Sequence, residues 1–440
     1  MYRISVLCVL LLISSLSFAQ KPAKAKLIIY GQGEAALASA IQASKSGVTT
    51  LWINPDAAFS SNLTEGQDIK SINSYKNLDA GLWAEFLKLS LNAKEYSDSV
   101  FNYAKVYLSP QISKNTFEKM IDSAENLSVI YNTEIERIKK SGKKWKIDLS
   151  NGQKYSVYAL VDASKQAKLI PLISEKERLE KKETDSISPI NTNQLYNSTA
   201  YRTSLMVEDR DGHEWLIPTA SLLKPYAENF FVVHGPNGLI QKLNEATPDD
   251  VPTLMLYGQS IGAIASYCAF FETTVDKINI RTLQGELLAF KGQLLPFHDV
   301  AFEDVNNSSI QRIGLTGIIQ GRLDNEDGKG AKLIFDVDKH VSSMELEPIM
   351  HSLYTRSQIW FSDKSIEELK LKDLISLIKF IALKGDELDT QIENGWEKKF
   401  HFNGIYDPEC LITRKQAAVL IDNYLQPFSI KVNKAGSFQR

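Results

Sequence analysis

The stretch that sets the architecture of this chain is Leu27-Ile28-Ile29-Tyr30-Gly31-Gln32-Gly33-Glu34-Ala35-Ala36-Leu37-Ala38-Ser39-Ala40. Four apolar residues run into Gly-x-Gly-x-x-Ala, and a second apolar strand, Thr50–Ile53, follows the intervening helix. This order is typical of a buried parallel strand, a tight turn and a helix N-terminus that together hold a dinucleotide diphosphate. In that reading Gly31 permits the turn, Gly33 lets the diphosphate approach the backbone, and Ala36 keeps the helix close to the sheet. The stretch therefore predicts a doubly wound α/β domain with a dinucleotide site.

One residue departs from that pattern. Asn54 stands at the end of the second strand, where an acidic residue usually binds the ribose hydroxyls. An asparagine can hydrogen-bond a ribose, but without the assistance of a charge, so we expect a weaker contact. The alternative is a retained fold whose cofactor has been weakened or lost.

The first 19 residues have the pattern of an export signal. Met1-Tyr2-Arg3 is a short positive start, Val6–Leu16 is apolar, and Ser17-Phe18-Ala19 is a small-x-small cleavage site. The apolar run is too short for a comfortable membrane span, and no later apolar run is long enough to span a bilayer. We therefore expect cleavage after Ala19 and a periplasmic or secreted protein without a transmembrane segment.

Composition describes an ordinary globular chain. Of its 440 residues, 43% are hydrophobic, which is enough for a large core, and the length favours two or three domains. The net charge of −3 gives no reason to expect nucleic acid as a partner. Without its first 19 residues the chain keeps Cys268 and Cys410, and whether they pair is left open. No Cys-x-x-C pair is present, which excludes a dithiol-exchanging flavoprotein, and no Cys/His cluster has metal-ligand spacing.

Further segments indicate the rest of the organisation. Turn residues Asn151-Gly152 predict a hairpin within a run of short strands, followed by an apolar strand at Ala159–Ser164. A late apolar run, Leu254–Tyr257, leads into Gly258-Gln259-Ser260-Ile261-Gly262 and a helix through Phe271, so it repeats the opening pattern. Helical periodicity appears at 82–91 and 116–124, and further short strands are expected at 129–131, 135–138, 145–149, 155–158, 216–218 and 230–235.

Residues 26–300 resemble the FAD-dependent oxidoreductase family of exported bacterial proteins, some of which are labelled xanthan lyase. The resemblance rests on the opening glycine turn, the mid-chain Val161-Asp162-Ala163-Ser164, the late Gly258 segment and Val275–Leu287. It implies a glutathione-reductase-like domain with a parallel sheet, a β-meander and a substrate region inserted at about 170–230. It further implies FAD at the glycine turn, with Gly258, Gln259 and Gly262 beside the ribityl chain and the flavin. The implied activity is hydride exchange with the flavin for an unidentified small-molecule or carbohydrate substrate.

Two residues have open alternatives. His234 has the place of a family histidine and is the candidate catalytic residue, but a histidine beside Gly235-Pro236 can also be a turn residue. Asp162 could contact a ribityl hydroxyl or cap a helix. The alternative to an oxidoreductase is a protein that is not an enzyme: a cofactor-free scaffold or a glycan-binding protein of the envelope.

The tail, residues 301–440, is expected to be mainly helical. Ser342-Ser343-Met344-Glu345 and Thr413-Arg414-Lys415-Gln416 each follow a short apolar segment and precede a helix. These two copies resemble the start of S-layer homology repeats, which implies an envelope glycan as a partner. Because both copies depart from the family's Thr-Arg-Glu-Glu, a structural helical cap is the alternative.

Overall fold

The computed structural model describes residues 24–65, 72, 78–179, 190–210, 213–223, 225–234, 247–324, 332–362 and 364–439. The predicted export signal and most of the charged segment 175–188 lie outside the described residues. In these ranges, every helix falls short of the length and apolarity that crossing a membrane requires.

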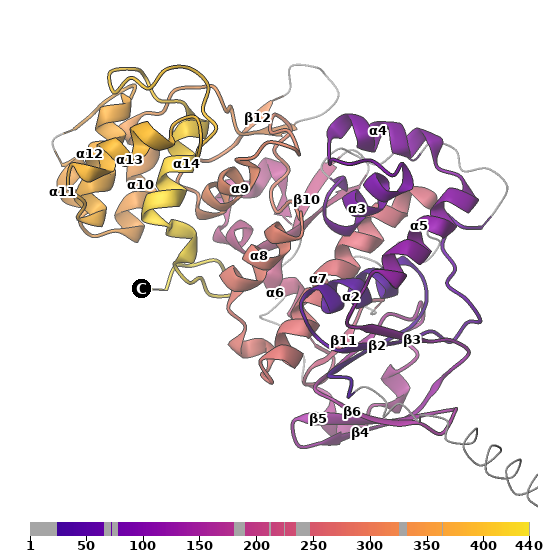
Figure 1. Cartoon of the computed structure of the whole chain (residues 1–440). Coiled ribbons are helices and arrows are strands. Elements are labelled where there is room, and N and C mark those ends of the chain that lie inside the picture. Colours follow the sequence, from indigo (N-terminus) through magenta and orange to yellow (C-terminus); the bar gives the residue numbers. More distant parts are fainter. Residues whose placement is uncertain are drawn as a thin grey trace, which may run out of the picture.

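A five-stranded parallel sheet forms the centre of the first part of the chain (Figure 1). Its strands are β1 (Leu27–Tyr30), β2 (Thr50–Ile53), β3 (Leu127–Ile130), β7 (Ala159–Asp162) and β11 (Phe230–Val232), in the order β11-β7-β1-β2-β3. All four pairings are parallel. The chain order reverses at β1, which pairs with β2 on one side and β7 on the other. The predicted α/β class with a Rossmann-like sheet is confirmed.

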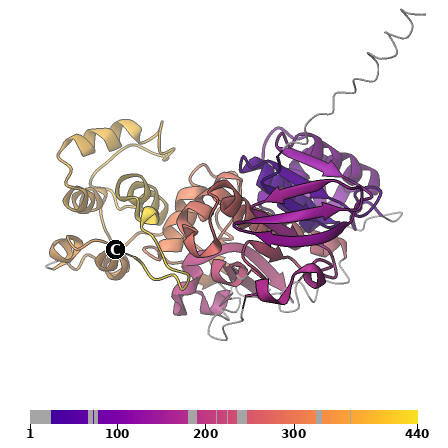
Figure 2. The same ribbon diagram turned by 90° about the horizontal axis from the view of Figure 1, so that it is seen from below.

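The two faces of the sheet are covered differently, because alternate strand residues point to opposite sides. Leu27 and Ile29 of β1 belong to a large core that also holds the helices. Ile28 and Tyr30 belong to a second core with Trp145 and other residues of an antiparallel meander. Figures 1 and 2 show the helices on one face and the meander on the other. The meander consists of β4 (Ile135–Ser141), β5 (Lys144–Leu149) and β6 (Lys154–Val157), with the predicted turn at Asn151-Gly152.

Four helices cover the helical face in the first part of the chain. They are α2 (Glu34–Lys45), α3 (Gly81–Ser90), α4 (Asp98–Tyr107) and α5 (Pro110–Asp122). Of these, α3 confirms the predicted helix at 82–91, α5 begins six residues before the predicted 116, and α4 was not predicted. A second sheet, in the order β8-β10-β9, comes from β8 (Ile190–Asn191), β9 (Ser204–Arg210) and β10 (His213–Pro218), and the short α6 (Thr219–Leu222) follows it.

The late segment does not repeat the opening strand and turn. Leu254–Tyr257 lies inside α7 (Val251–Phe270), which begins seven residues before Gly258 and has Pro252 in its first turn. The expectation of a helix that begins at the glycine is therefore wrong. The reason is that α7 is buried almost all round, so its first turns read as a continuous apolar run. The helix α8 (Ile280–Ala289) follows, capped by Asn279.

The tail is helical, as expected, and lies apart from the parallel sheet (Figure 1). It begins with α9 (Asn307–Thr316) and a two-stranded sheet of β12 (Arg322–Asp324) and β13 (Lys332–Ile334). The remaining helices are α10 (Ser343–Leu353), α11 (Ser357–Phe361), α12 (Leu371–Ala382), α13 (Glu387–Gly395) and α14 (Arg414–Leu425). Ser342 and Thr413 cap α10 and α14 through their hydroxyls, as predicted.

The tail contains three related segments, and the sequence predicted only two. Val341, Leu369 and Ile412 each stand two residues before a helix, namely α10, α12 and α14. Their backbones form a closed ring. Leu369 N–H donates to Val341 C=O at 2.7 Å, Ile412 N–H to Leu369 C=O at 2.9 Å, and Val341 N–H to Ile412 C=O at 3.3 Å. The middle copy could not be recognised from the sequence, because Lys370 stands where the other two copies have Ser or Thr.

Both cysteines of the described chain are free. Cys268 is buried in α7, and Cys410 is exposed in the tail. The two do not pair in this structure.

Candidate functional site

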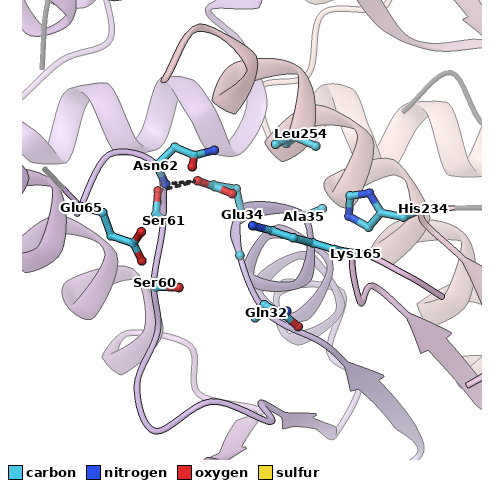
Figure 3. Close-up of a pocket in the computed structure, with 11 residues that line it drawn as sticks. Gln32, Glu34, Ala35, Ser60, Ser61, Asn62, Glu65, Lys165, His234 and Leu254 are labelled. Atoms are coloured by element: carbon cyan, nitrogen blue, oxygen red, sulfur yellow. Dashed lines mark hydrogen bonds between the residues drawn. The ribbon is translucent and has the colours of Figure 1, made fainter. Parts of the chain in front are cut away.

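A pocket lies at the carboxyl edge of the parallel sheet (Figure 3). Because all five strands run the same way, the segments after β1, β2, β7 and β11 meet at this edge. The switch point of an open α/β sheet is where such domains bind ligands, and here it lies between β1 and β7. The pocket is lined by Gln32, Gly33, Glu34, Ala35, Ser60, Ser61, Asn62, Glu65, Lys165, His234 and Leu254.

The two glycines of the opening motif have different physical roles. Gly31 has φ +132°, and a Cβ there would lie 2.5 Å from the backbone of Ala163 and Ser164, so this glycine lets β1 leave the sheet beside β7. Gly33 has φ +83°, and a Cβ there would meet nothing within 4 Å. The space above Gly33 is therefore open toward the pocket. The indole N–H of Trp52 donates to Gly31 C=O at 2.9 Å and holds the turn against β2.

Glu34 is the residue of the pocket that sequence reasoning missed. It is the first residue of α2, and its side chain is only 5% exposed. Ser61 Oγ donates to Glu34 Oε1 at 2.5 Å, and the Asn62 backbone N–H donates to the same oxygen at 2.9 Å. Figure 3 shows the carboxylate directed at this loop after β2. No signal in the motif marks Glu34, since its position in Gly-x-Gly-x-x-Ala is unrestricted.

His234 lies in the pocket, two residues after β11, and Lys165 reaches across from the turn after β7 (Figure 3). Burial first, and the Lys165 charge second, lower the pKa of His234 to about 4, so its imidazole is neutral at pH 7. Its Nδ1 is buried without a hydrogen-bond partner among the described residues, and so is Oε1 of Gln32. Both atoms are therefore available to hydrogen-bond a molecule bound in the pocket.

Two predicted cofactor residues are engaged elsewhere. Asn54 is fully buried, and its Oδ1 accepts from the Asp56 backbone N–H at 3.0 Å, while Nδ2 donates to Ala58 C=O at 3.5 Å. Asp162 accepts hydrogen bonds from Ser164 and from the Leu169 N–H, so it caps the turn after β7. Burial raises the pKa of Asp162. Neither side chain lines the pocket, and Asp162 caps a turn where the alternative expected a helix.

The remaining predicted cofactor residues lie in the interface of α2 and α7. A Cβ on Gly258 would lie 2.4 Å from Ala35 O, and a Cβ on Gly262 would lie 2.5 Å from Ser39 O. The Gln259 side chain accepts from the Leu82 N–H at 3.0 Å and donates to Gln42 Oε1 at 2.9 Å. These three residues pack the helix that supports the pocket, and contact with a flavin stays a prediction for them. Ala36 is likewise fully buried between helix and sheet, in the packing role expected of it.

Residues 26–188 match the family described as FAD dependent oxidoreductase. The match supports a general FAD-dependent oxidoreductase role for this part of the chain, with FAD as the cofactor. The match confirms the general class expected from the opening glycine turn, whose residues it includes. The match ends before β11, α7 and the tail.

Several solved structures are similar to part of the chain. Bacillithiol disulfide reductase from Staphylococcus aureus is 19% identical over 32% of this chain and 38% of its own length, with a TM-score of 0.24. Thioredoxin reductase from T. acidophilum is 13% identical over 32% and 35%, with a TM-score of 0.22. The chain thus spans little more than a third of these proteins. A search of curated proteins found no match.

The residues at the pocket fit a dinucleotide diphosphate in two respects. Gly33 leaves room for close approach, and Lys165 supplies a cation. The first N–H groups of α2 have no intrahelical acceptor and point toward an anion at this end. Glu34 opposes the fit, because its carboxylate brings negative charge to the same helix end.

We expect the pKa of His234 to respond to Lys165. In the Lys165→Ala variant the cation is lost while burial remains, so the pKa should rise from about 4 toward 6.5 without reaching it. The measurement is an NMR titration of the imidazole, assigned with His234→Gln. Lys168→Ala is the control, since Lys168 is an exposed lysine three residues on that pairs with Glu134. An unchanged pKa in Lys165→Ala would show that the lysine does not face the imidazole.

Proposed function

We propose that this protein is an exported FAD-dependent oxidoreductase that acts on a small molecule or a carbohydrate. The general oxidoreductase role follows from the family match. The observation that carries the proposed site is the pocket at the carboxyl edge of the sheet, where open space above Gly33 adjoins two unpartnered polar atoms. Export and the substrate class rest on the sequence alone.

The chain's own residues would have separate tasks. FAD supplies hydride chemistry when it is bound, and the protein supplies position and electrostatics. Gly33 and the first turn of α2 would hold the diphosphate, and Lys165 would balance part of its charge. His234 is neutral at pH 7, so its Nδ1 can accept a proton or a hydrogen bond from a bound molecule.

Purified protein should carry a flavin absorbance band, or should gain one when it is refolded with excess FAD. In the Gly33→Ala variant, the new methyl group would project into the space that the diphosphate needs, so FAD affinity should fall about tenfold or more. Titration of flavin fluorescence measures this affinity.

Gly47→Ala is the matched control for that prediction. Gly47 has φ +74°, close to the +83° of Gly33, and a Cβ there also meets nothing within 4 Å. Both variants place a Cβ at positive φ, and Gly33→Ala carries the greater strain because ψ −171° at Gly33 lies in a region that is nearly exclusive to glycine; Gly47 lies at the other end of α2. If the two variants lose FAD affinity equally, strain and not diphosphate approach is responsible, and the proposed site is wrong.

The alternative is a cofactor-free scaffold, and two observations favour it. The Glu34 carboxylate lies at the helix end that would meet the diphosphate, and Asn54 is committed to its own turn. Wild-type protein that shows neither bound flavin nor a thermal shift at saturating FAD would establish this alternative.

For the tail we propose a structural cap in preference to glycan binding. The supporting observation is Arg414, the arginine of the second repeat-like start, which is buried. It pairs with Glu345 of the first copy and donates to Phe335 C=O at 2.6 Å. A side chain engaged in this way is not available to a glycan. Co-sedimentation of the protein with purified envelope polysaccharide would overturn this proposal.

A further inference from the structure

The Glu34 carboxylate is placed where an anionic ligand of α2 would be. It is the first residue of the helix, whose free N–H groups and dipole favour negative charge. It is buried, yet among the residues that the structure describes no lysine, arginine or histidine forms an ion pair with it. The buried negative charge of Glu34 is stabilised by hydrogen bonds from the Ser61 hydroxyl and the Asn62 N–H, and by the N-terminal end of α2. A dinucleotide diphosphate would use the same helix end.

The loop that Glu34 holds is compact and anchored. Ser61 Oγ also accepts from the Leu63 N–H at 3.1 Å, and Thr64 Oγ1 donates to Ser61 C=O at 3.0 Å. Leu63 is fully buried. The loop is therefore a defined structure that is fixed to α2 through one carboxylate oxygen. It also forms one wall of the pocket, through Ser60, Ser61 and Asn62 (Figure 3).

We propose that Glu34 is a built-in competitor for the cofactor diphosphate, and that cofactor binding requires the Glu34–Ser61–Asn62 contact to open. Ligand-free protein is stabilised by the carboxylate at the helix end, and this stabilisation opposes binding. When a diphosphate approaches Gly33, like charges repel, and the carboxylate must turn away. The inference rests on the proposed function, because it assumes that the site takes a dinucleotide.

The competition predicts opposite changes in stability and in affinity. Glu34→Gln removes the charge and keeps an oxygen that can accept from Ser61. Without ligand, this variant should unfold at a lower temperature, because it loses the charge-assisted hydrogen bonds and the interaction with the helix dipole. Its affinity for FAD should nevertheless rise about tenfold or more, because the repulsion is gone. A merely structural residue would lower both quantities.

Two further variants sharpen the test. Glu65→Gln removes a charge from the exposed rim of the same pocket, where solvent screens it, so affinity should change less than about threefold. Ser61→Ala loses the 2.5 Å hydrogen bond and should raise FAD affinity by a smaller factor than Glu34→Gln. Since both changes act on one contact, their effects in the double variant should not add. Ser61→Ala also serves if Glu34→Gln does not fold.

Measuring ADP binding alongside FAD binding distinguishes failure of this inference from failure of the proposed function. Affinities of wild-type protein and Glu34→Gln are measured for FAD by fluorescence and for ADP by calorimetry. If Glu34→Gln binds ADP more tightly than wild-type protein does, and neither protein binds FAD, the proposal that Glu34 competes with a diphosphate stands and the proposed oxidoreductase function is rejected. FAD binding that is equal or weaker in Glu34→Gln would reject the competition and keep the oxidoreductase. If neither protein binds FAD or ADP, both are rejected.

Discussion

Gly258→Ala should destabilise the protein by about 3 kcal/mol, because overpacking a close backbone contact allows little relief. A Cβ at this position would lie 2.4 Å from Ala35 O and 2.8 Å from Ala35 Cα, which are main-chain atoms that cannot rotate away. Ser39 Oγ, moreover, donates to Gly258 C=O at 2.8 Å, so separating the helices also lengthens this hydrogen bond. Denaturant unfolding measures the loss. Because Ala35 lines the pocket, FAD affinity should fall as well.

Gly285→Ala is the matched control for that substitution. Gly285 lies inside α8, and a Cβ there would meet nothing within 4 Å. Alanine has the higher helix propensity, so this variant should be neutral or more stable by up to about 1 kcal/mol. Equal effects of the two substitutions would mean that α2 and α7 are not in close contact.

Lys105→Met should destabilise the protein at pH 7 by about 3–5 kcal/mol, the range for removing one partner of a buried ion pair. Lys105 Nζ lies 2.6 Å from Asp79 Oδ2, and both side chains are less than 10% exposed. The Trp83 indole N–H donates to the other Asp79 oxygen at 3.1 Å. The pair joins α4 to the segment before α3, and without Lys105 the carboxylate would be buried without its cation.

The destabilisation should depend on pH in a defined direction. Burial raises the pKa of Asp79 to about 6 from 3.8, although Lys105 lowers it in part. A raised carboxyl pKa means that the folded state holds its proton more tightly, so this group's contribution to stability is lost as pH rises from 3.8 through 6. Removing Lys105 raises that pKa further, so the variant should lose less stability at pH 5 than at pH 7.

Lys434→Met provides the control for the ion pair. Lys434 and Asp276 are 2.9 Å apart, but their side chains are 45% and 79% exposed. An exposed pair of this kind contributes about 0–1 kcal/mol, with little dependence on pH between 5 and 7. A Lys105→Met variant that behaves like Lys434→Met would show that the buried pair is not formed in solution.

Much of the fold could be predicted because its strands are short apolar runs bounded by turn residues. The bounds of β1 and β2 match the predicted strands residue for residue, and the hairpin turns at the predicted Asn151-Gly152. α7 could not be predicted in this way, since a helix buried on every side lacks the polar face that gives a 3.6-residue period. Pro252 near its start was the available signal.

The candidate site was only partly predictable. Gly33 and His234 line the pocket as residues from a motif and a strand end can be expected to do. Glu34, Ser61 and Lys165 come from an unrestricted motif position and from two loops, and only the sheet topology brings them together. Asn54 and Asp162 follow strands of that sheet too, but their side chains satisfy nearby backbone groups, which residue type alone does not reveal.

The backbone ring of Val341, Leu369 and Ile412 makes the order of synthesis matter for the tail. During translation, Val341 and Leu369 are made before Ile412. Until Ile412 follows, the Val341 N–H and the Leu369 C=O therefore lack their hydrogen-bond partner in the ring. A chain that stops short of Ile412 leaves the ring open, and α10 and α12 lose the apolar surface of α14. Until Ile412 has been synthesised, the segments that precede α10 and α12 should therefore be open to proteases, and closure of the ring should protect them.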